Sequence, residues 1–163
     1  MTVSLPPFQA LLDAHGRDVH RFLIATVGAG DADDCYQETW LAALRAYPRL
    51  RDASNLRGWI LTVAHRKAID QLRARARRPV LVSDPEPLAV APSARMQPAA
   101  EPRDDALWAG VAALPAKQCA AIALRFVADC AYAEIGAVMQ TTPEAARRSV
   151  HEGLTRLRKE YRP

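Results

Sequence analysis

The chain of 163 residues has few cysteines and no long apolar run. Its cysteines, Cys35, Cys119 and Cys130, are odd in number and lack CxxC spacing, so the sequence indicates neither a disulfide framework nor a zinc site. We expect them to be small buried residues, and we expect no cofactor and no bound metal. No stretch of about 18 apolar residues is present to cross a bilayer, and the first residues show no leader pattern, so we expect a cytoplasmic protein.

Motifs that carry catalysis are also missing. The sequence has no glycine-rich phosphate loop, no nucleophile elbow and no paired histidine ligands. His15 and His20 are five residues apart, while His65 and His151 lie in different halves of the chain. Paired carboxylates occur only where an exposed helix start is expected. We therefore expect that the protein is not an enzyme.

Charge is abundant and is arranged in blocks. The stretch 31–40, DADDCYQETW, has four acidic residues and no basic one, whereas residues 41–78 have ten Lys or Arg against two acids, a net charge of +8. A basic block suits a polyanion such as nucleic acid, and an acidic block does not. The pattern therefore predicts two different kinds of partner.

The apolar spacing predicts an all-α protein of two small helical domains. In residues 1–78 it predicts three helices. The first spans about 6–27, the second runs from an aspartate cap at 31 or 33 to Pro48, and the third spans about 56–78. Residues 79–105 contain six of the twelve prolines and read as a Pro-rich linker. Residues 106–163 form a second unit of short helices.

The predicted second helix carries two stripes. One is apolar and aromatic and consists of Tyr36, Trp40, Leu44 and Tyr47. The other consists of Asp34, Gln37, Glu38 and Leu41. Acidic residues in a first helical turn favour the helix dipole, but that explanation weakens beyond the turn. The second stripe fits a protein partner with a basic surface.

The predicted third helix has a face made of Trp59, Val63, Arg66, Asp70, Arg73 and Arg77. Two interpretations stay open from the residues alone. The arginines can form an ordinary solvated face while Trp59 joins the core. Alternatively, an aromatic ring at one end of an arginine row suits single-stranded nucleic acid, because bases stack on the ring and arginines follow the phosphates.

Two short helices in the last third of the chain suggest a helix-turn-helix. Thr142 followed by Pro143 is typical of an N-cap with proline at the first helical position. The exposed side of the last helix carries Glu144, Ala145, Arg147, Arg148 and His151, which can enter a major groove. An ordinary helical hairpin shows the same apolar stripes, so the motif alone leaves both readings open.

Taken in order, three segments resemble the extracytoplasmic-function group of the sigma-70 family of RNA polymerase sigma factors. They are DADDCYQETWLAALRAY, NLRGWILTVAHRKAIDQLR, and the segment from LPAKQ to LTRLRK. The resemblance implies that residues 1–78 bind the polymerase core and open the minus-10 element, and that residues 106–163 read the minus-35 element. Elements two helical turns apart lie about 70 Å from each other, which a 27-residue tether of about 90 Å can span.

The resemblance also implies site residues and partners. The core-binding candidates, facing the clamp helices of the largest polymerase subunit, are Asp34, Gln37, Glu38, Leu41 and Arg45. The candidates for minus-10 DNA are Asn55, Arg57, Trp59, Arg66 and Arg73, with Asn55 as the reader of a flipped base. The candidates for minus-35 DNA are Glu144, Ala145, Arg147, Arg148 and His151. Further implied partners are the flap of the second polymerase subunit, promoter DNA, and an anti-sigma factor that controls the protein in trans.

Four residues depart from the family pattern. Cys119 and Glu152 stand where basic residues are common, Asp129 replaces a frequent glycine, and Ala131 replaces a frequent Ser or Thr cap. The missing cap is expected to cost about 1 kcal/mol. Two other functions remain to be distinguished: a stand-alone helix-turn-helix regulator with an N-terminal sensor or dimerisation domain, and an adaptor protein that does not contact DNA.

Overall fold

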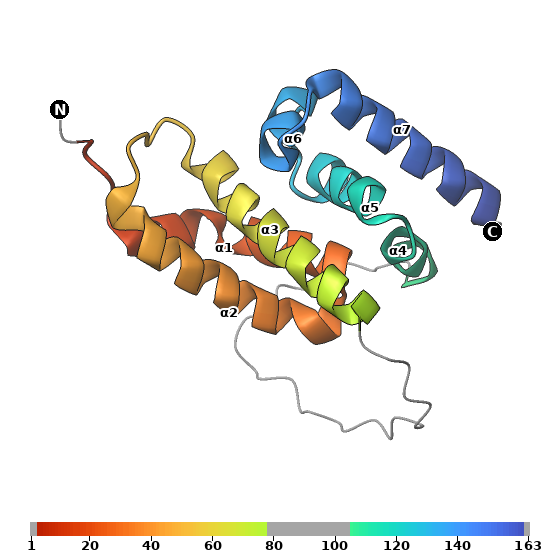
Figure 1. Cartoon of the computed structure of the whole chain (residues 1–163), viewed down its shortest axis with the longest axis horizontal. Helices are drawn as coiled ribbons and strands as arrows, with labels where there is room; N and C mark the ends of the chain where they lie inside the picture. The colour runs from red at the N-terminus through yellow and green to blue at the C-terminus, as the bar shows by residue number, and fades with distance from the viewer. Residues whose placement is uncertain (1–2, 78–104, 162–163) are drawn as a thin grey trace.

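The protein is built from helices. The computed structural model describes residues 3–77 and 105–161, and every regular element in these ranges is helical, which confirms the all-α prediction (Figure 1). The N-terminal unit consists of α1 (Phe8–Val27), α2 (Ala29–Ala46), a 3-10 turn (Tyr47–Arg49) and α3 (Leu56–Arg77). The C-terminal unit consists of α4 (Asp105–Ala112), α5 (Ala116–Ile122), a π-helical turn η2 (Ala123–Val127), α6 (Tyr132–Met139) and α7 (Pro143–Glu160). The predicted linker lies outside the described residues except for its last residue, where α4 begins.

A single glycine separates α1 from α2. Gly28 has a φ of 84°, a backbone conformation that glycine adopts without a Cβ penalty. Its carbonyl already accepts a hydrogen bond from the N–H of Ala32 at 3.0 Å, so α2 begins directly at Ala29. The predicted aspartate cap is therefore wrong: Asp31 lies inside the first turn, Asp33 lies beyond it, and no side chain caps α2.

The three long helices enclose an apolar core. Phe22 from α1 and Ile60 from α3 are completely buried; removing such side chains from water contributes about 1.5–3 kcal/mol each. Trp40 and Tyr47 are also buried, as the predicted stripe requires. Leu44 is not, with half of its surface exposed. Its place in that stripe is wrong, because α2 turns it away from α1 and α3 toward solvent.

The helix-turn-helix of α6 and α7 matches the prediction in detail. Gln140 ends α6 with a φ of 55°, and Thr142 then caps α7 by accepting a hydrogen bond from the N–H of Ala145 at 3.1 Å. Pro143 is the first residue of α7. Gly136 permits the tight turn, since a Cβ there would lie 2.8 Å from a backbone oxygen of Thr141.

The start of α6 compensates for its missing cap. Asp129 adopts a φ of 53° in the preceding turn, a conformation that Asp tolerates better than most residues. Ala131 has no side-chain acceptor, but its N–H donates to the carboxylate of Glu134 at 2.8 Å. One of the free N–H groups at this helix end is thus satisfied from within the helix.

The two units pack against each other along a contact that we call the inter-domain seam. Helix α6 packs on α3, while α4 and η2 pack on α1 (Figure 1). The thiol of Cys119 in α5 donates to the carbonyl of Ala25 in α1 at 3.6 Å, and Arg57 of α3 donates to the carbonyl of Ala128. Buried residues of both units belong to one continuous hydrophobic cluster. The sequence did not predict this association.

All three cysteines are buried free thiols, as predicted. None of the helices within residues 3–77 and 105–161 is long and apolar enough to cross a membrane. Over the same residues, no group of three or more His, Cys, Asp or Glu side chains is placed to hold a metal ion.

Candidate protein and nucleic-acid interfaces

Helix α2 presents an exposed face that mixes acidic and apolar side chains. It contains the five residues predicted for core binding, Asp34, Gln37, Glu38, Leu41 and Arg45, all of them exposed, and also Leu44. Leu41 and Leu44 are 52% and 50% exposed, and because residues three apart are neighbours on a helix surface, they form a small apolar patch. We call this set the acidic α2 face. The sequence analysis missed Leu44 because its spacing also fits the buried stripe.

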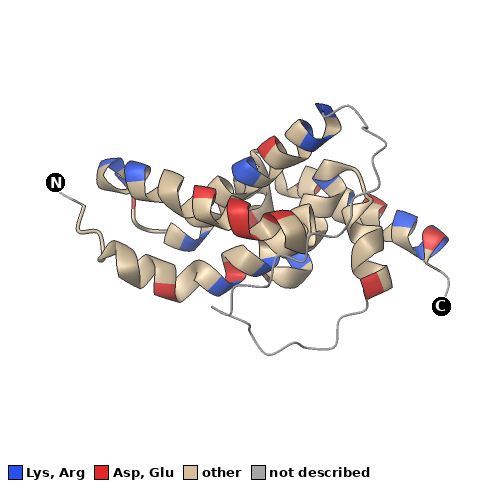
Figure 2. Cartoon of the chain, turned by 90° about the horizontal axis from the view of Figure 1, so that it is seen from below, with Lys and Arg blue, Asp and Glu red and all other residues tan. Residues whose placement is uncertain are grey.

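The acidic residues of this region divide into two groups. Asp31 is paired with Arg75 of α3, and Asp33 lies 3.2 Å from the ring nitrogen of His20 in α1, so these two carboxylates join α2 to its neighbours. Asp34 and Glu38 form no ion pair within the described part of the chain. Figure 2 shows acidic segments gathered near the middle of the molecule, with basic segments on either side. Asp34 and Glu38 are therefore open to a partner, and Asp33, although it contacts His20, also keeps a side chain that is 77% exposed.

The buried thiol of Cys35 lies within the negative field of the nearby carboxylates. The pKa of Cys35 is raised to about 11, first because the thiol is buried and then because the carboxylates of Glu38, Asp31 and Asp34 disfavour a thiolate. A negative field around two exposed leucines suits a protein surface with basic groups around an apolar patch. The same field repels the phosphates of nucleic acid.

Asn55 lies exposed in the loop before α3. Its Oδ1 accepts a hydrogen bond from the N–H of Gly58 at 2.9 Å, and its main-chain carbonyl accepts one from Trp59 at 3.1 Å. Asn55 is therefore the N-cap of α3. Just before it, the Oδ1 of Asp52 accepts from the N–H of Ser54 at 2.8 Å. Hydrogen bonds from the side chain of Ser54 and then from its backbone N–H lower the pKa of Asp52.

Arg57 and Trp59 are both engaged within the protein. Besides donating to the carbonyl of Ala128, Arg57 donates to the sulfur of Cys130 at 3.6 Å and lies 3.6 Å from a carboxylate oxygen of Asp18. Its side chain is only 30% exposed. Trp59 is partly buried, and its ring packs 6.0 Å from that of Tyr47. The packing of Trp59 agrees with the interpretation in which this ring joins the core, whereas nothing in the sequence indicated the contacts of Arg57, which depend on residues far away in the chain.

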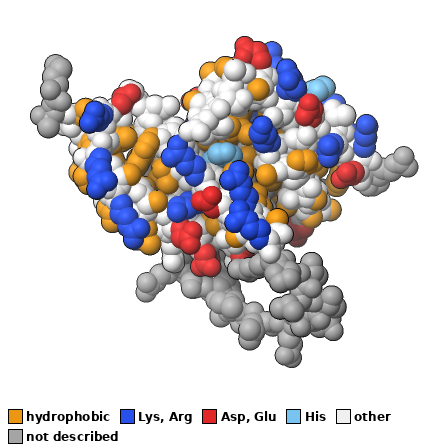
Figure 3. Space-filling view, in the orientation of Figure 1, with side chains coloured by type: hydrophobic (Ala, Val, Ile, Leu, Met, Phe, Trp, Pro, Cys, Tyr) orange, Lys and Arg blue, Asp and Glu red, His pale blue; other side chains and the backbone are white. Residues whose placement is uncertain are grey.

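Arg66 and Arg73 remain exposed farther along α3. Next to Arg66 in the sequence is His65, whose Nδ1 is buried and has no hydrogen-bond partner among the described residues. Burial, and then the charge of Arg66, lower the pKa of His65 to about 4. His65 is thus neutral near pH 7. Figure 3 shows Lys and Arg side chains spread over both units on one face of the molecule.

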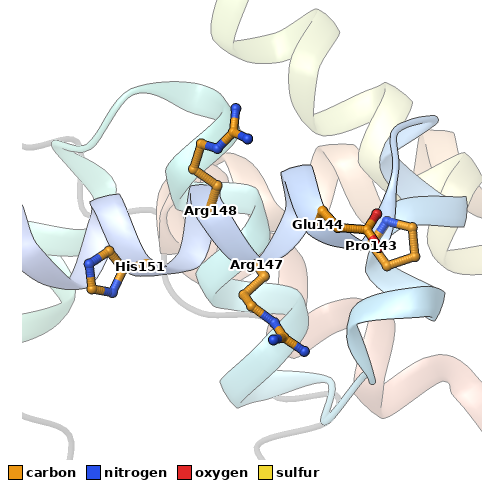
Figure 4. A pocket seen from close by; sticks show the side chains of 5 residues that line it. All are labelled: Pro143, Glu144, Arg147, Arg148 and His151. Carbon is orange, nitrogen blue, oxygen red and sulfur yellow. The ribbon is translucent and has the colours of Figure 1, made fainter.

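The start of α7 lines an open groove. Its lining consists of Pro143, Glu144, Arg147, Arg148 and His151, and Figure 4 shows the two arginines extending in different directions from the helix. Thus four of the five predicted minus-35 residues share this groove. The fifth, Ala145, is half-buried and donates its N–H to the Thr142 cap.

Two contacts hold charged side chains in and beside this groove in fixed positions. The guanidinium of Arg147 lies 5.0 Å from the ring centroid of Tyr132, which also carries Arg125 at 4.9 Å. Stacking on the ring limits the freedom of Arg147 before any ligand binds. On the other flank, Glu152 accepts a hydrogen bond from the Nε2 of Gln118 at 3.4 Å. Glu152, the acidic residue of α7 that departs from the family pattern, is therefore held toward α5.

Comparisons with known proteins agree on both units. Residues 11–78 match the family model described as Sigma-70 region 2, and residues 110–159 match Sigma-70, region 4. The chain is 32% identical over 139 residues to the ECF RNA polymerase sigma factor ShbA of Streptomyces griseus, covering 79% of this chain and 73% of that protein. It is 38% identical over 71 residues to the ECF RNA polymerase sigma factor SigC of Mycobacterium tuberculosis, covering 44% of this chain and 38% of SigC.

Two solved structures share the fold. One is the sigma factor RpoE in complex with the anti-sigma factor NepR from Bartonella quintana, with a TM-score of 0.68, 21% identity, and coverage of 93% of this chain and 92% of RpoE. The other is CnrH in complex with the cytosolic domain of CnrY, with a TM-score of 0.68, 17% identity, and coverage of 93% and 85%. The two-unit helical arrangement therefore recurs in proteins of very different sequence.

Proposed function

The chain belongs to the extracytoplasmic-function group of the sigma-70 family, and from this membership we propose that it is a transcription initiation factor that binds RNA polymerase core and directs it to promoters. In this proposal residues 1–78 bind the core and open the minus-10 element, residues 79–105 form a linker, and residues 106–163 read the minus-35 element. The protein itself catalyses no reaction and works in the cytoplasm, where the polymerase is. The observation that carries the proposal is the presence on one chain of an exposed acidic face on α2 and an arginine-lined groove on α7.

Core binding is assigned to the acidic α2 face. Its free carboxylates and two exposed leucines offer charge and apolar area together, which favours binding to a basic protein surface such as the clamp helices of the largest subunit. Asp34, Gln37, Glu38, Leu41 and Arg45 are the proposed contacts, and Leu44 joins them.

Contact with minus-10 DNA is assigned to the loop before α3 and to the outer face of that helix. Asn55, Arg66 and Arg73 are exposed and can meet a single strand as the chain stands. Arg57 and Trp59 are engaged inside the protein, so their proposed contacts require a rearrangement at the inter-domain seam and around Tyr47.

Contact with minus-35 DNA is assigned to the α7 groove. Arg147 and Arg148 offer donors for guanine or phosphate, and Glu144, Ala145 and His151 flank them. Region 4 is also the unit we assign to the flap of the second polymerase subunit. An anti-sigma factor is a further proposed partner, since the sigma factor RpoE in one of the similar solved structures is bound to the anti-sigma factor NepR.

Run-off transcription tests the proposal directly. Purified core polymerase is assayed with and without the protein on promoter fragments from its own genome. We expect discrete transcripts that require the protein and are lost with Glu38→Lys. Duplex binding by the protein alone, with no transcripts when core is added, would instead support a stand-alone regulator.

A further inference from the structure

The C-terminal unit has two cysteines, and both of them face the inter-domain seam. The thiol of Cys119 in α5 lies 3.6 Å from the carbonyl oxygen of Ala25 in α1, and the sulfur of Cys130 lies 3.6 Å from Nη1 of Arg57 in α3. Each of these contacts crosses from one unit to the other. The remaining cysteine, Cys35, lies in α2 within the N-terminal unit.

Neither seam sulfur has room for a substituent while the two units are in contact, which we call the closed form. Cys119 and Cys130 are each only 1% exposed. Cys119 packs with Val111 and Ile122 of its own unit and meets α1 on its other side, and Cys130 belongs to the cluster that continues through both units. Because protein interiors are close-packed, a group of several heavy atoms on either sulfur is accommodated only when the units separate.

We propose that Cys119 and Cys130 are modification sites at which a low-molecular-weight disulfide converts the closed form to an open form with separated units. When the seam opens transiently, the thiolate of either cysteine attacks one sulfur of the disulfide. The new S–S bond forms as the old one breaks, so the cysteine sulfur is oxidised and the leaving sulfur is reduced. The leaving thiolate then takes up the proton that the cysteine released.

The resulting mixed disulfide shifts the conformational equilibrium. The modified chain is compatible with the open form and not with the closed one, so each modification removes a molecule from the closed population. Burial raises the pKa of Cys119 to about 11 and also raises that of Cys130, so the closed form reacts slowly and the reaction follows opening. The seam therefore protects the thiols, and the adduct in turn keeps the seam open.

The consequence for activity rests on the proposed function. Opening releases Arg57 from the carbonyl of Ala128, and separated units are free to reach separate promoter elements. If only the open form binds polymerase core productively, the modified protein binds core more tightly, by the factor by which the open fraction rises. A disulfide stress would then raise transcription through this chain itself.

The test treats the full-length protein with glutathione disulfide and locates the adducts by peptide mass spectrometry. Small-angle X-ray scattering then measures the radius of gyration, which for a compact chain of 163 residues is about 15 Å. We expect a larger radius after modification of Cys119 or Cys130, an unchanged helical circular dichroism signal, and return to the starting radius on reduction with dithiothreitol. Core affinity is measured on the same samples.

Two matched variants identify the responsible thiols. The double variant Cys119→Ser with Cys130→Ser keeps a donor for the Ala25 carbonyl and an acceptor for Arg57, but it cannot form a mixed disulfide. It should stay compact in glutathione disulfide. Cys35→Ser should expand as the wild type does.

The other outcomes contradict the proposal in distinct ways. An adduct at either seam cysteine with an unchanged radius would show that the closed form accommodates the substituent. Expansion with loss of helicity, or expansion that reduction does not reverse, would show that the adduct unfolds the C-terminal unit. Equal expansion of the double serine variant would exclude the seam thiols as the cause. Reversible expansion without core binding by either the reduced or the modified protein would support the switch and contradict the proposed function.

Discussion

Replacing Arg57 with alanine should loosen the inter-domain seam. The substitution removes the charged donor to the Ala128 carbonyl, the weak contact with the Cys130 sulfur, and the ion pair with Asp18. A hydrogen bond from a charged group contributes about 1.5–3 kcal/mol. The ion pair with Asp18 joins α3 to α1 inside the N-terminal unit, so it does not contribute to the contact between the units. A loss of about 2 kcal/mol from the contact between the units raises the fraction of open molecules roughly thirtyfold.

The buried cysteines report this opening. Cys119 and Cys130 both lie at the seam. Cys130 contacts Arg57 itself, and Cys119 donates to the carbonyl of Ala25 across the same interface. Cys35 lies within the N-terminal unit. Burial raises the pKa of Cys119 to about 11 and also raises that of Cys130, so both thiols react slowly in the closed form. In the full-length protein, labelling followed by peptide mass spectrometry gives the reaction rate of each thiol separately.

The expected result is selective acceleration. Cys119 and Cys130 should react roughly thirtyfold faster in Arg57→Ala, in proportion to the open fraction, while Cys35 should keep its wild-type rate. Arg66→Ala is the matched control, because Arg66 lies exposed on the same helix. Unchanged seam thiols in Arg57→Ala would show that Arg57 does not hold the units together. Equal acceleration of all three thiols would show that it supports the fold of the N-terminal unit instead.

Three further predictions concern the helix-turn-helix and the dependence of stability on pH. Gly136→Ala should lower the free energy of unfolding by about 1–3 kcal/mol in denaturant titrations, because the new Cβ meets the rigid backbone at Thr141; unchanged stability would contradict the tight turn. Thr142→Ala should cost about 1 kcal/mol by the same measurement, and Thr142→Ser should restore most of it, since a hydroxyl again caps α7. His65 has a folded-state pKa of about 4, below its usual value of 6.5, so the unfolded chain binds the proton more readily and stability should fall as the pH drops from about 6.5 toward 4. The effect is at most about 3 kcal/mol, and His65→Gln should show a smaller loss between pH 7 and 5; an equal loss would refute the assignment.

Local signals in the sequence were sufficient for the helices and the helix-turn-helix. The Thr142 cap, Pro143 at the first helical position and the strained turn at Asp129 each act over a few residues, so their chemistry predicts their structure. The predicted start of α2 was wrong because Gly28 alone separates α1 from α2, so the helix needs no capping aspartate. Leu44 was misplaced because the spacing of α2 fits both a buried and an exposed stripe.

The contacts between distant residues could not be predicted in the same way. Arg57 looks in sequence like any other arginine of the basic block, and only the packing of α6 on α3 brings it to the Ala128 carbonyl. The division of the acidic cluster has the same origin, since Asp31 and Asp33 have partners on α3 and α1, while Glu38 forms no ion pair with any residue that the structure describes. The sequence thus identified candidate residues, and the fold decides which of them are free.

The central claim is that this protein enables RNA polymerase core to open promoter DNA, and permanganate footprinting of unpaired thymines measures that opening directly. On a promoter identified by run-off transcription, the account predicts reactive thymines in the minus-10 region only when core and protein are both present. It also predicts their loss with Glu38→Lys, which removes docking through the acidic α2 face. Thymines that react with core alone, or that remain equally reactive with Glu38→Lys, would contradict the account.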